Sequence, residues 1–130
     1  MDKQAIDGNI FSQSELLRDI PESQASEILN TGIRKTLQKD EILFHQGDLA
    51  AKCYFLLSGR IKLTKLHEEG REAVIRYITP GGLTAAGVVL KGNQYPVTAK
   101  SLWLTTLIGW DKNTMLSVMH QYPQISVSCL

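Results

Sequence analysis

The sequence is poor in cysteine and carries almost no net charge. Its 130 residues include only two cysteines, Cys53 and Cys129, and 14 basic residues face 13 acidic ones for a net charge of +1. Two thiols cannot supply the four ligands of an iron–sulfur cluster or of an all-cysteine zinc site. Because the basic residues are scattered among nearly as many acids, the usual mark of a DNA-binding domain is also missing. We expect reduced cysteines, with Cys53 buried and inert in an apolar strand.

Long hydrophobic runs are absent as well. The longest nearly uncharged stretch, residues 77–90, is broken by Pro80, Gly81 and Gly82 well short of a membrane-spanning length. Residues 1–8 mix charged and small side chains, so no secretory signal is expected. The length suits one domain with a single core. We therefore expect a cytoplasmic protein of one domain without a membrane segment.

Helical patterns are confined to the two ends of the chain. A weak pattern covers residues 12–18, and a stronger one begins at Pro21, which suits the first turn of a helix, and ends near Gly32. Toward the other end, Asp111 is placed to cap a helix over residues 112–121. The chain is therefore expected to open with one or two short helices and to return to a helix after its central region.

The last residues suggest the beginning of a further helix. Pro123 suits a first helical turn, but the sequence reaches Leu130 within about two turns. So short a helix has little reason to form alone. We therefore expect an element that is truncated here and continues in a longer parent protein.

The central region is a series of short β-strand patterns. Runs rich in β-branched and aromatic residues alternate with turns that contain Gly, Asp or Ser. Ile61 and Leu63 alternate with Lys62 and Thr64, which predicts a strand with one face toward solvent. Many short strands at this spacing predict an antiparallel barrel, roll or sandwich. The expected strands cover residues 41–45, 53–57, 60–66, 72–78, 95–100 and 102–110.

Four short segments follow one another in a distinctive order. Each is an ordinary turn or strand by itself, but their order and spacing together resemble the sensor domain of the Crp/Fnr transcription regulators and the wider cyclic-nucleotide-binding domains. The resemblance covers roughly residues 20–130 and implies a mainly β protein, an antiparallel double-stranded β-roll, jelly-roll-like, with short N-terminal helices and a C-terminal helix. The segments are Phe44-His45-Gln46-Gly47-Asp48, Tyr54-Phe55-Leu56-Leu57-Ser58-Gly59-Arg60-Ile61-Lys62-Leu63, Gly70-Arg71-Glu72 and Pro80-Gly81.

The resemblance also implies an organisation and a set of partners. Residues 1–18 would form an N-terminal extension with a short helix, and residues 19–130 a β-roll sensor domain that ends inside its dimerisation helix. The parent protein would bind a small-molecule effector, form a homodimer through the helix after Pro123, and bind DNA only through a helix-turn-helix domain outside this sequence. It would not be an enzyme.

Two alternatives to a regulator remain open. One is a stand-alone ligand-binding or interaction domain of the same fold. The other is a cupin-like enzyme, which is the weaker alternative because the sequence shows no clustered histidines, no nucleophile beside a base and no phosphate loop.

The nucleotide contacts of the family are missing from this sequence. In the family the effector lies beside the segment after the Pro-Gly turn, where cyclic-nucleotide binders place a Glu for the ribose and, later, an Arg followed by Ser or Thr for the cyclic phosphate. Ala86 stands at the Glu, Tyr95 at the Arg and Pro96 at the hydroxyl position. Losing both charged contacts costs about 3 to 6 kcal/mol, or roughly two to four decades of affinity. We therefore expect that cyclic AMP and cyclic GMP do not bind.

The replacement residues predict an apolar effector pocket with the Tyr95 phenol as its polar group. Such a lining suits a hydrophobic or aromatic ligand or a flat cofactor; alternatively the segment packs shut, with Tyr95 filling the space of the nucleotide. Residues 95–99 are similar to those of haem-containing nitric-oxide regulators of the Crp/Fnr family, so haem is the leading specific candidate. The expected lining comprises Leu83, Ala85, Ala86, Gly87, Val88, Tyr95, Pro96 and Val97.

No pair of histidines has the spacing of metal ligands, so no metal site is expected. His67 lies in a charged hairpin and His120 at a helix end, where solvated positions are expected. His45, beside Phe44 on a strand, is the remaining candidate for a haem ligand.

Overall fold

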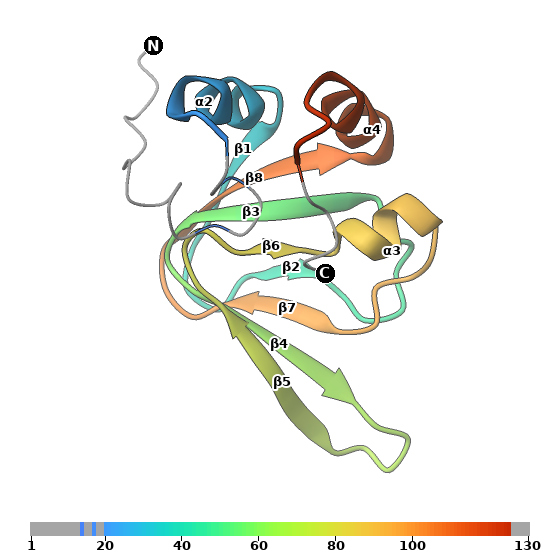
Figure 1. The fold of residues 1–130 in the computed structure, drawn as a ribbon. Coiled ribbons are helices and arrows are strands. Elements are labelled where there is room, and N and C mark those ends of the chain that lie inside the picture. Colours follow the sequence, from blue (N-terminus) through green and yellow to red (C-terminus); the bar gives the residue numbers. More distant parts are fainter. Residues whose placement is uncertain (1–13, 15–16, 18–19, 126–130) are drawn as a thin grey trace.

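Two antiparallel four-stranded sheets face each other in the computed structural model, which describes residues 14, 17 and 20–125 (Figure 1). The first sheet has the strand order β1-β8-β3-β6 and the second the order β2-β7-β4-β5. This is the predicted β-roll. The strands are β1 (Ile33–Leu37), β2 (Ile42–Phe44), β3 (Lys52–Ser58), β4 (Ile61–Leu66), β5 (Glu72–Ile78), β6 (Leu83–Thr84), β7 (Thr98–Ser101) and β8 (Thr105–Asp111).

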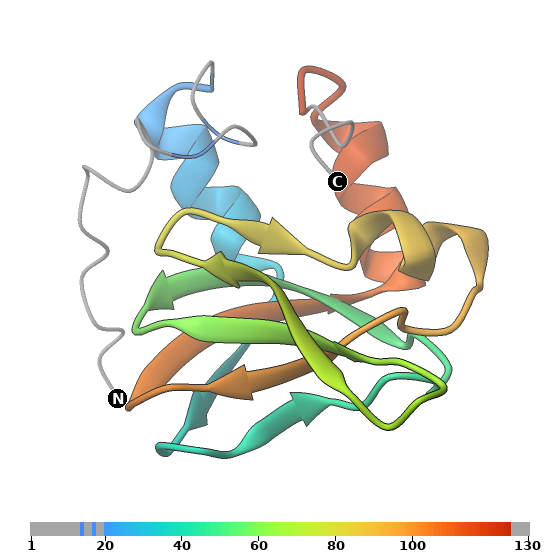
Figure 2. The same cartoon turned by 90° about the horizontal axis from the view of Figure 1, so that it is seen from below.

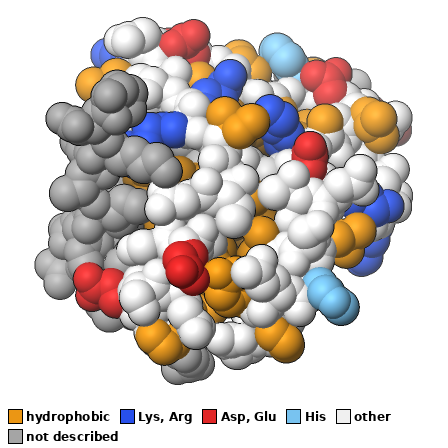
Figure 3. All heavy atoms as spheres, turned by 90° about the horizontal axis from the view of Figure 1, so that it is seen from above, with side chains coloured by type: hydrophobic (Ala, Val, Ile, Leu, Met, Phe, Trp, Pro, Cys, Tyr) orange, Lys and Arg blue, Asp and Glu red, His pale blue; other side chains and the backbone are white. Residues whose placement is uncertain are grey.

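Helices α2 (Glu22–Asn30) and α4 (Lys112–Gln121) lie on the outer face of the first sheet (Figure 1). The Asp111 carboxylate caps α4 as predicted, accepting a hydrogen bond from the Thr114 N–H at 2.8 Å. A short helix, α3 (Ala86–Lys91), follows β6 and was not predicted. Seen from the side of α2 and α4, acidic and basic side chains are interspersed without a broad patch of one sign (Figure 3).

Two sequence predictions concern residues that lie largely outside the described part of the chain. In the expected helix over residues 12–18, the structure describes only Ser14 and Leu17, which are both buried. Pro123 and Gln124 form a turn, and the rest of the expected last helix lies outside the described residues. Within the described residues, no helix is both long and apolar enough to cross a membrane.

The central strands of the first sheet are buried on both faces. Residues 53–56 of β3 and 107–110 of β8 are all buried, because the second sheet covers one face and the helices cover the other. Trp110 is 1% exposed, and its indole N–H donates a hydrogen bond to Thr31 Oγ1 at 2.8 Å. This hydrogen bond joins the end of α2 to the middle of the core.

The β4–β5 hairpin contains a β-bulge. Leu63 pairs with Arg76, but Thr64 pairs with Val74, so Ile75 is an extra residue in β5. The predicted solvent face of β4 is right for Lys62 but wrong for Thr64, which is 5% exposed. The Thr64 hydroxyl lies 3.4 Å from the Glu72 carboxylate, a partner on β5 that makes burial of the hydroxyl tolerable.

Candidate effector pocket

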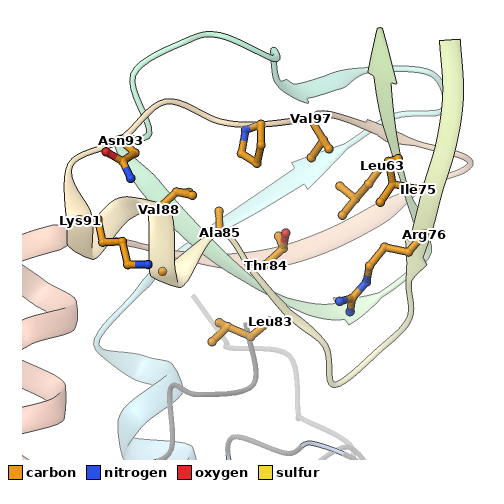
Figure 4. A pocket seen from close by; sticks show the side chains of 12 residues that line it. Leu63, Ile75, Arg76, Leu83, Thr84, Ala85, Val88, Lys91, Asn93 and Val97 are labelled. Carbon is orange, nitrogen blue, oxygen red and sulfur yellow. The ribbon is translucent and has the colours of Figure 1, made fainter. Parts of the chain in front are cut away.

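A hollow of about 390 Å³ opens between α3, the β4–β5 hairpin and the chain before β7 (Figure 4). We call it the α3 pocket. Its volume lies within the range of small-molecule sites. The lining consists of Leu63, Ile75, Arg76, Leu83, Thr84, Ala85, Gly87, Val88, Lys91, Asn93, Pro96 and Val97.

The short helix α3 forms one wall of the α3 pocket. Ala85 precedes it in the left-handed conformation, with φ 73°, and Gly92 ends it with φ 72°. These two reversals turn the chain sharply at both ends of the helix. Ala86 and Val89 then pack into the core, whereas Val88 is half-buried and faces the hollow (Figure 4).

Arg76 enters the α3 pocket from β5. It pairs directly with Leu63, which is 6% exposed and part of the core. Side chains of directly paired residues lie on the same face of a sheet, so the register places Arg76 on the inner face. Its side chain lines the hollow and extends from β5 toward the side of the hollow where Leu83 and Thr84 lie (Figure 4).

Lys91 lies at the opposite side of the α3 pocket, on the last turn of α3 (Figure 4). The lining therefore holds two cationic side chains and no acidic one. We had expected an uncharged lining, and the sequence reasoning missed both residues. Alternation along β5 could have found Arg76, since it stands two residues before the buried Ile78.

The structure brings six of the eight expected lining residues to the α3 pocket: Leu83, Ala85, Gly87, Val88, Pro96 and Val97. Ala86 does not line it, because this side chain is fully buried on the core side of α3. Tyr95 does not line it either, and the expectation that its phenol is the polar group of the pocket is wrong.

Tyr95 is a core residue that ties two loops together. Its ring stacks on Phe44 with centroids 3.8 Å apart. Its hydroxyl donates to the Lys52 carbonyl at 2.7 Å and accepts from the Lys52 N–H at 3.1 Å. Burial raises the pKa of this phenol above its ordinary value. Tyr95 thus fills space beneath the loop before β3, and the α3 pocket remains open beside it.

The histidines do not reach the α3 pocket. His45 and His67 are exposed and line a second, wider hollow near the tip of the β4–β5 hairpin. His45 directly follows Phe44, the buried last residue of β2, and its own side chain is exposed. His45 is therefore wrong as a haem ligand in the α3 pocket. Among the described residues, no group of three His, Cys, Asp or Glu side chains could hold a metal ion.

Cys53 is buried as predicted, and its thiol is unreactive. It is 0% exposed on β3, and burial raises its pKa to about 12. A thiol with so high a pKa is a poor nucleophile at neutral pH. Cys129 lies outside the described residues.

The β-roll with a hollow beside a short helix is the architecture of regulatory sensor modules. A family model described as the cyclic nucleotide-binding domain matches residues 34–122. The chain belongs to this family. Its fold and family are those of regulatory domains, which excludes the cupin-like enzyme.

Comparisons with individual proteins point to transcription regulators. The chain is 24% identical over 93 residues to the cyclic AMP receptor protein of Thermus thermophilus, covering 72% of this chain and 43% of that protein. It is 30% identical over 60 residues to the global nitrogen regulator of a Nostoc species, covering 46% of this chain and 27% of that protein. The crystal structure of the Thermus thermophilus catabolite activator protein matches with a TM-score of 0.81 at 23% identity, covering 85% of this chain and 52% of that one. The chain therefore corresponds to the sensor domain of such regulators and spans less than half the length of these two curated relatives.

Proposed function

We propose that this chain is the effector-sensing domain of a Crp/Fnr-type transcription regulator, and that its effector is a small molecule other than a cyclic nucleotide. The observation that carries the proposal is the α3 pocket itself, an open hollow of about 390 Å³ in a fold of this family. At the positions where the family holds a cyclic nucleotide, the chain has the buried side chains Ala86 and Tyr95.

Ala86 and Tyr95 argue against a cyclic nucleotide for different reasons. Ala86 offers no acceptor for the ribose hydroxyls, which would lose a charged hydrogen bond worth about 1.5 to 3 kcal/mol. Tyr95 is committed to Phe44 and Lys52, so its hydroxyl is not available to a phosphate. Arg76 and Lys91 could still attract a phosphate, but they enter from β5 and α3 and not from the position that the family uses.

The remaining parts of the proposal concern the whole protein. We infer a homodimer that forms through the helix after Pro123, a cytoplasmic location, and DNA binding by a further domain outside this sequence. We also propose that residues 19–130 are the sensor domain and residues 1–18 an extension. These inferences rest on the relatives, which include a receptor protein and a global regulator.

Haem, the specific effector that the sequence favoured, has little support from the lining of the α3 pocket. None of the lining residues of the α3 pocket is His, Cys, Met or Tyr, the side chains that hold haem iron in proteins. A haem held there would need an axial ligand from outside this lining. Titration with haem, followed by absorbance, should give no Soret shift that depends on His45, so wild type and His45→Ala should behave alike.

Calorimetry with cyclic AMP and cyclic GMP tests the main proposal. We expect no heat of binding at micromolar concentrations, while the Thermus thermophilus cyclic AMP receptor protein serves as the positive control. Micromolar binding by this chain would overturn the proposal and would mean that Arg76 and Lys91 replace the family's phosphate contacts.

A further inference from the structure

The α3 pocket combines an apolar lining with two positive charges. Seven of its twelve lining residues are aliphatic or proline, and Arg76 and Lys91 are its charged members. No aspartate or glutamate lines it. A site of this composition attracts an anion electrostatically and at the same time favours an apolar body.

Arg76 and Lys91 form no salt bridge with any residue that the structure describes. Elsewhere, Arg71 lies 3.5 Å from Glu69 and Lys100 lies 3.9 Å from Asp40. Among the described residues, no such pair includes Arg76 or Lys91, although both point to the same hollow from different elements. No described acidic side chain therefore competes with a ligand for these two charges.

The β-sheet register sets the face of β5 from which the exposed Arg76 side chain extends. Its partner across the hairpin is the buried Leu63, and the next inward residue of β5 is the buried Ile78. Arg76 is itself exposed to solvent, so its charge stays hydrated and is accessible to a ligand in the α3 pocket.

We propose that the effector is a small organic acid, an apolar body that carries at least one carboxylate. The Arg76 guanidinium, a planar fork of donors that matches a carboxylate, binds the acidic group. Lys91 adds a second positive charge from α3, and Val88, Leu83 and Val97 contact the apolar body. This inference rests on the proposed function, because it names the class of ligand for the same pocket.

Two fluorescent probes that differ only in charge test the inference. Anilinonaphthalene sulfonate is an apolar anion, and phenylnaphthylamine is the same ring system without the sulfonate. We expect Arg76→Gln and Lys91→Gln each to weaken binding of the sulfonate about fivefold, as expected for partly exposed charge pairs, and to leave the neutral probe unchanged. Octanoate should displace the sulfonate, and octanol at the same concentration should not.

Matched controls remove the same charge elsewhere. Arg34 and Lys35 lie exposed on β1, in the other sheet, and do not line the α3 pocket. Arg34→Gln and Lys35→Gln should leave both probes unchanged. An equal loss in these controls, or an equal loss of both probes in Arg76→Gln, would overturn the role of the two cations.

Blocking variants separate this inference from the proposed function. Val88→Trp fills the α3 pocket and should abolish binding of both probes, with Val97→Trp as a second blocking variant if circular dichroism shows that the first is unfolded. If the blocking variants leave binding intact, the probes bind elsewhere and the pocket is not the ligand site. If they abolish binding but Arg76→Gln and Lys91→Gln have no effect, the pocket remains the ligand site and the organic acid is excluded.

Discussion

Strands β3 and β5 are similarly rich in apolar residues, yet they lie in opposite surroundings. In β3, Phe55 is 0% exposed, whereas Ile75 and Tyr77 of β5 are 51% and 48% exposed. Helices cover the outer face of the sheet that contains β3, while the β4–β5 hairpin projects away from those helices (Figure 1), and Figure 2 views that second sheet from its uncovered side. The comparison suggests that the covered half provides the stability of the domain and the open half provides its ligand site.

Removing a large side chain from the covered half should have the largest effect on stability. Trp110→Ala should lower the free energy of unfolding by about 3 to 5 kcal/mol, because it leaves a cavity and removes the hydrogen bond to Thr31. Tyr77→Ala, in the open half, should cost less than about 1 kcal/mol. Urea unfolding followed by circular dichroism measures both, and equal losses would contradict the division into two halves.

Alkaline pH should weaken the covered half through its buried acids. Burial raises the pKa of Cys53 from 9.0 to about 12 in the folded chain. Because the pKa is higher in the folded chain, the stabilisation that the protonated Cys53 thiol contributes is fully present below about pH 9. It is lost as the pH rises from 9 to 12, by on the order of 1.4 kcal/mol per pH unit.

Urea unfolding at a series of pH values checks this expectation. In Cys53→Ala the decline of stability above pH 9 should be shallower, and the remaining decline should come mainly from Tyr54, whose pKa burial also raises to about 12. An unchanged alkaline decline in the variant would show that the thiol of Cys53 does not contribute.

A substitution of Tyr95 tests whether this residue contributes to the stability of the domain or to ligand binding in the α3 pocket. Tyr95→Phe keeps the stack on Phe44 but removes both hydrogen bonds to Lys52. We expect a loss of about 1 to 2 kcal/mol in the free energy of unfolding and unchanged affinity for anilinonaphthalene sulfonate. A loss of probe affinity at unchanged stability would show that the Tyr95 hydroxyl contacts the ligand and would contradict this expectation.

The smallest expected effect is a gain of stability at the start of α3. Ala85 adopts φ 73°, a conformation that strains alanine but not glycine. Ala85→Gly should raise the free energy of unfolding by about 0.5 to 1 kcal/mol, whereas Ala51→Gly, at an exposed position whose φ is not positive, should lower it. Thermal and urea unfolding measure both, and a loss in Ala85→Gly would mean that the left-handed turn does not limit stability.

The sequence predicted six of the eight strands because their signals are local, and it missed β1 and the two-residue β6. Alternating apolar residues and turn residues mark each strand, and β5 and α4 begin and end at the predicted residues. Helix α3 escaped prediction because it begins after a left-handed alanine and has no capping side chain. A six-residue helix of small and β-branched residues gives no periodic pattern of its own.

The pocket was only partly predictable for a related reason. The residues after the Pro-Gly turn were expected in the lining, and most of them lie there. The role of Tyr95 depends on Lys52, 43 residues earlier in the chain, and no local pattern reveals such a contact. Arg76 depends on the pairing of β5 with β4, which the sequence suggests only through alternation from Ile78.

Chemical-shift mapping of the isotopically labelled domain tests the central claim most directly. On addition of anilinonaphthalene sulfonate, we expect the Arg76 side-chain N–H signal and the methyl signals of Val88 and Val97 to shift, because they line the α3 pocket. The Trp110 indole N–H signal, in the covered half, should stay in place. Shifts at Trp110 without shifts at Arg76 and Val88 would contradict the assignment of ligand binding to the open half.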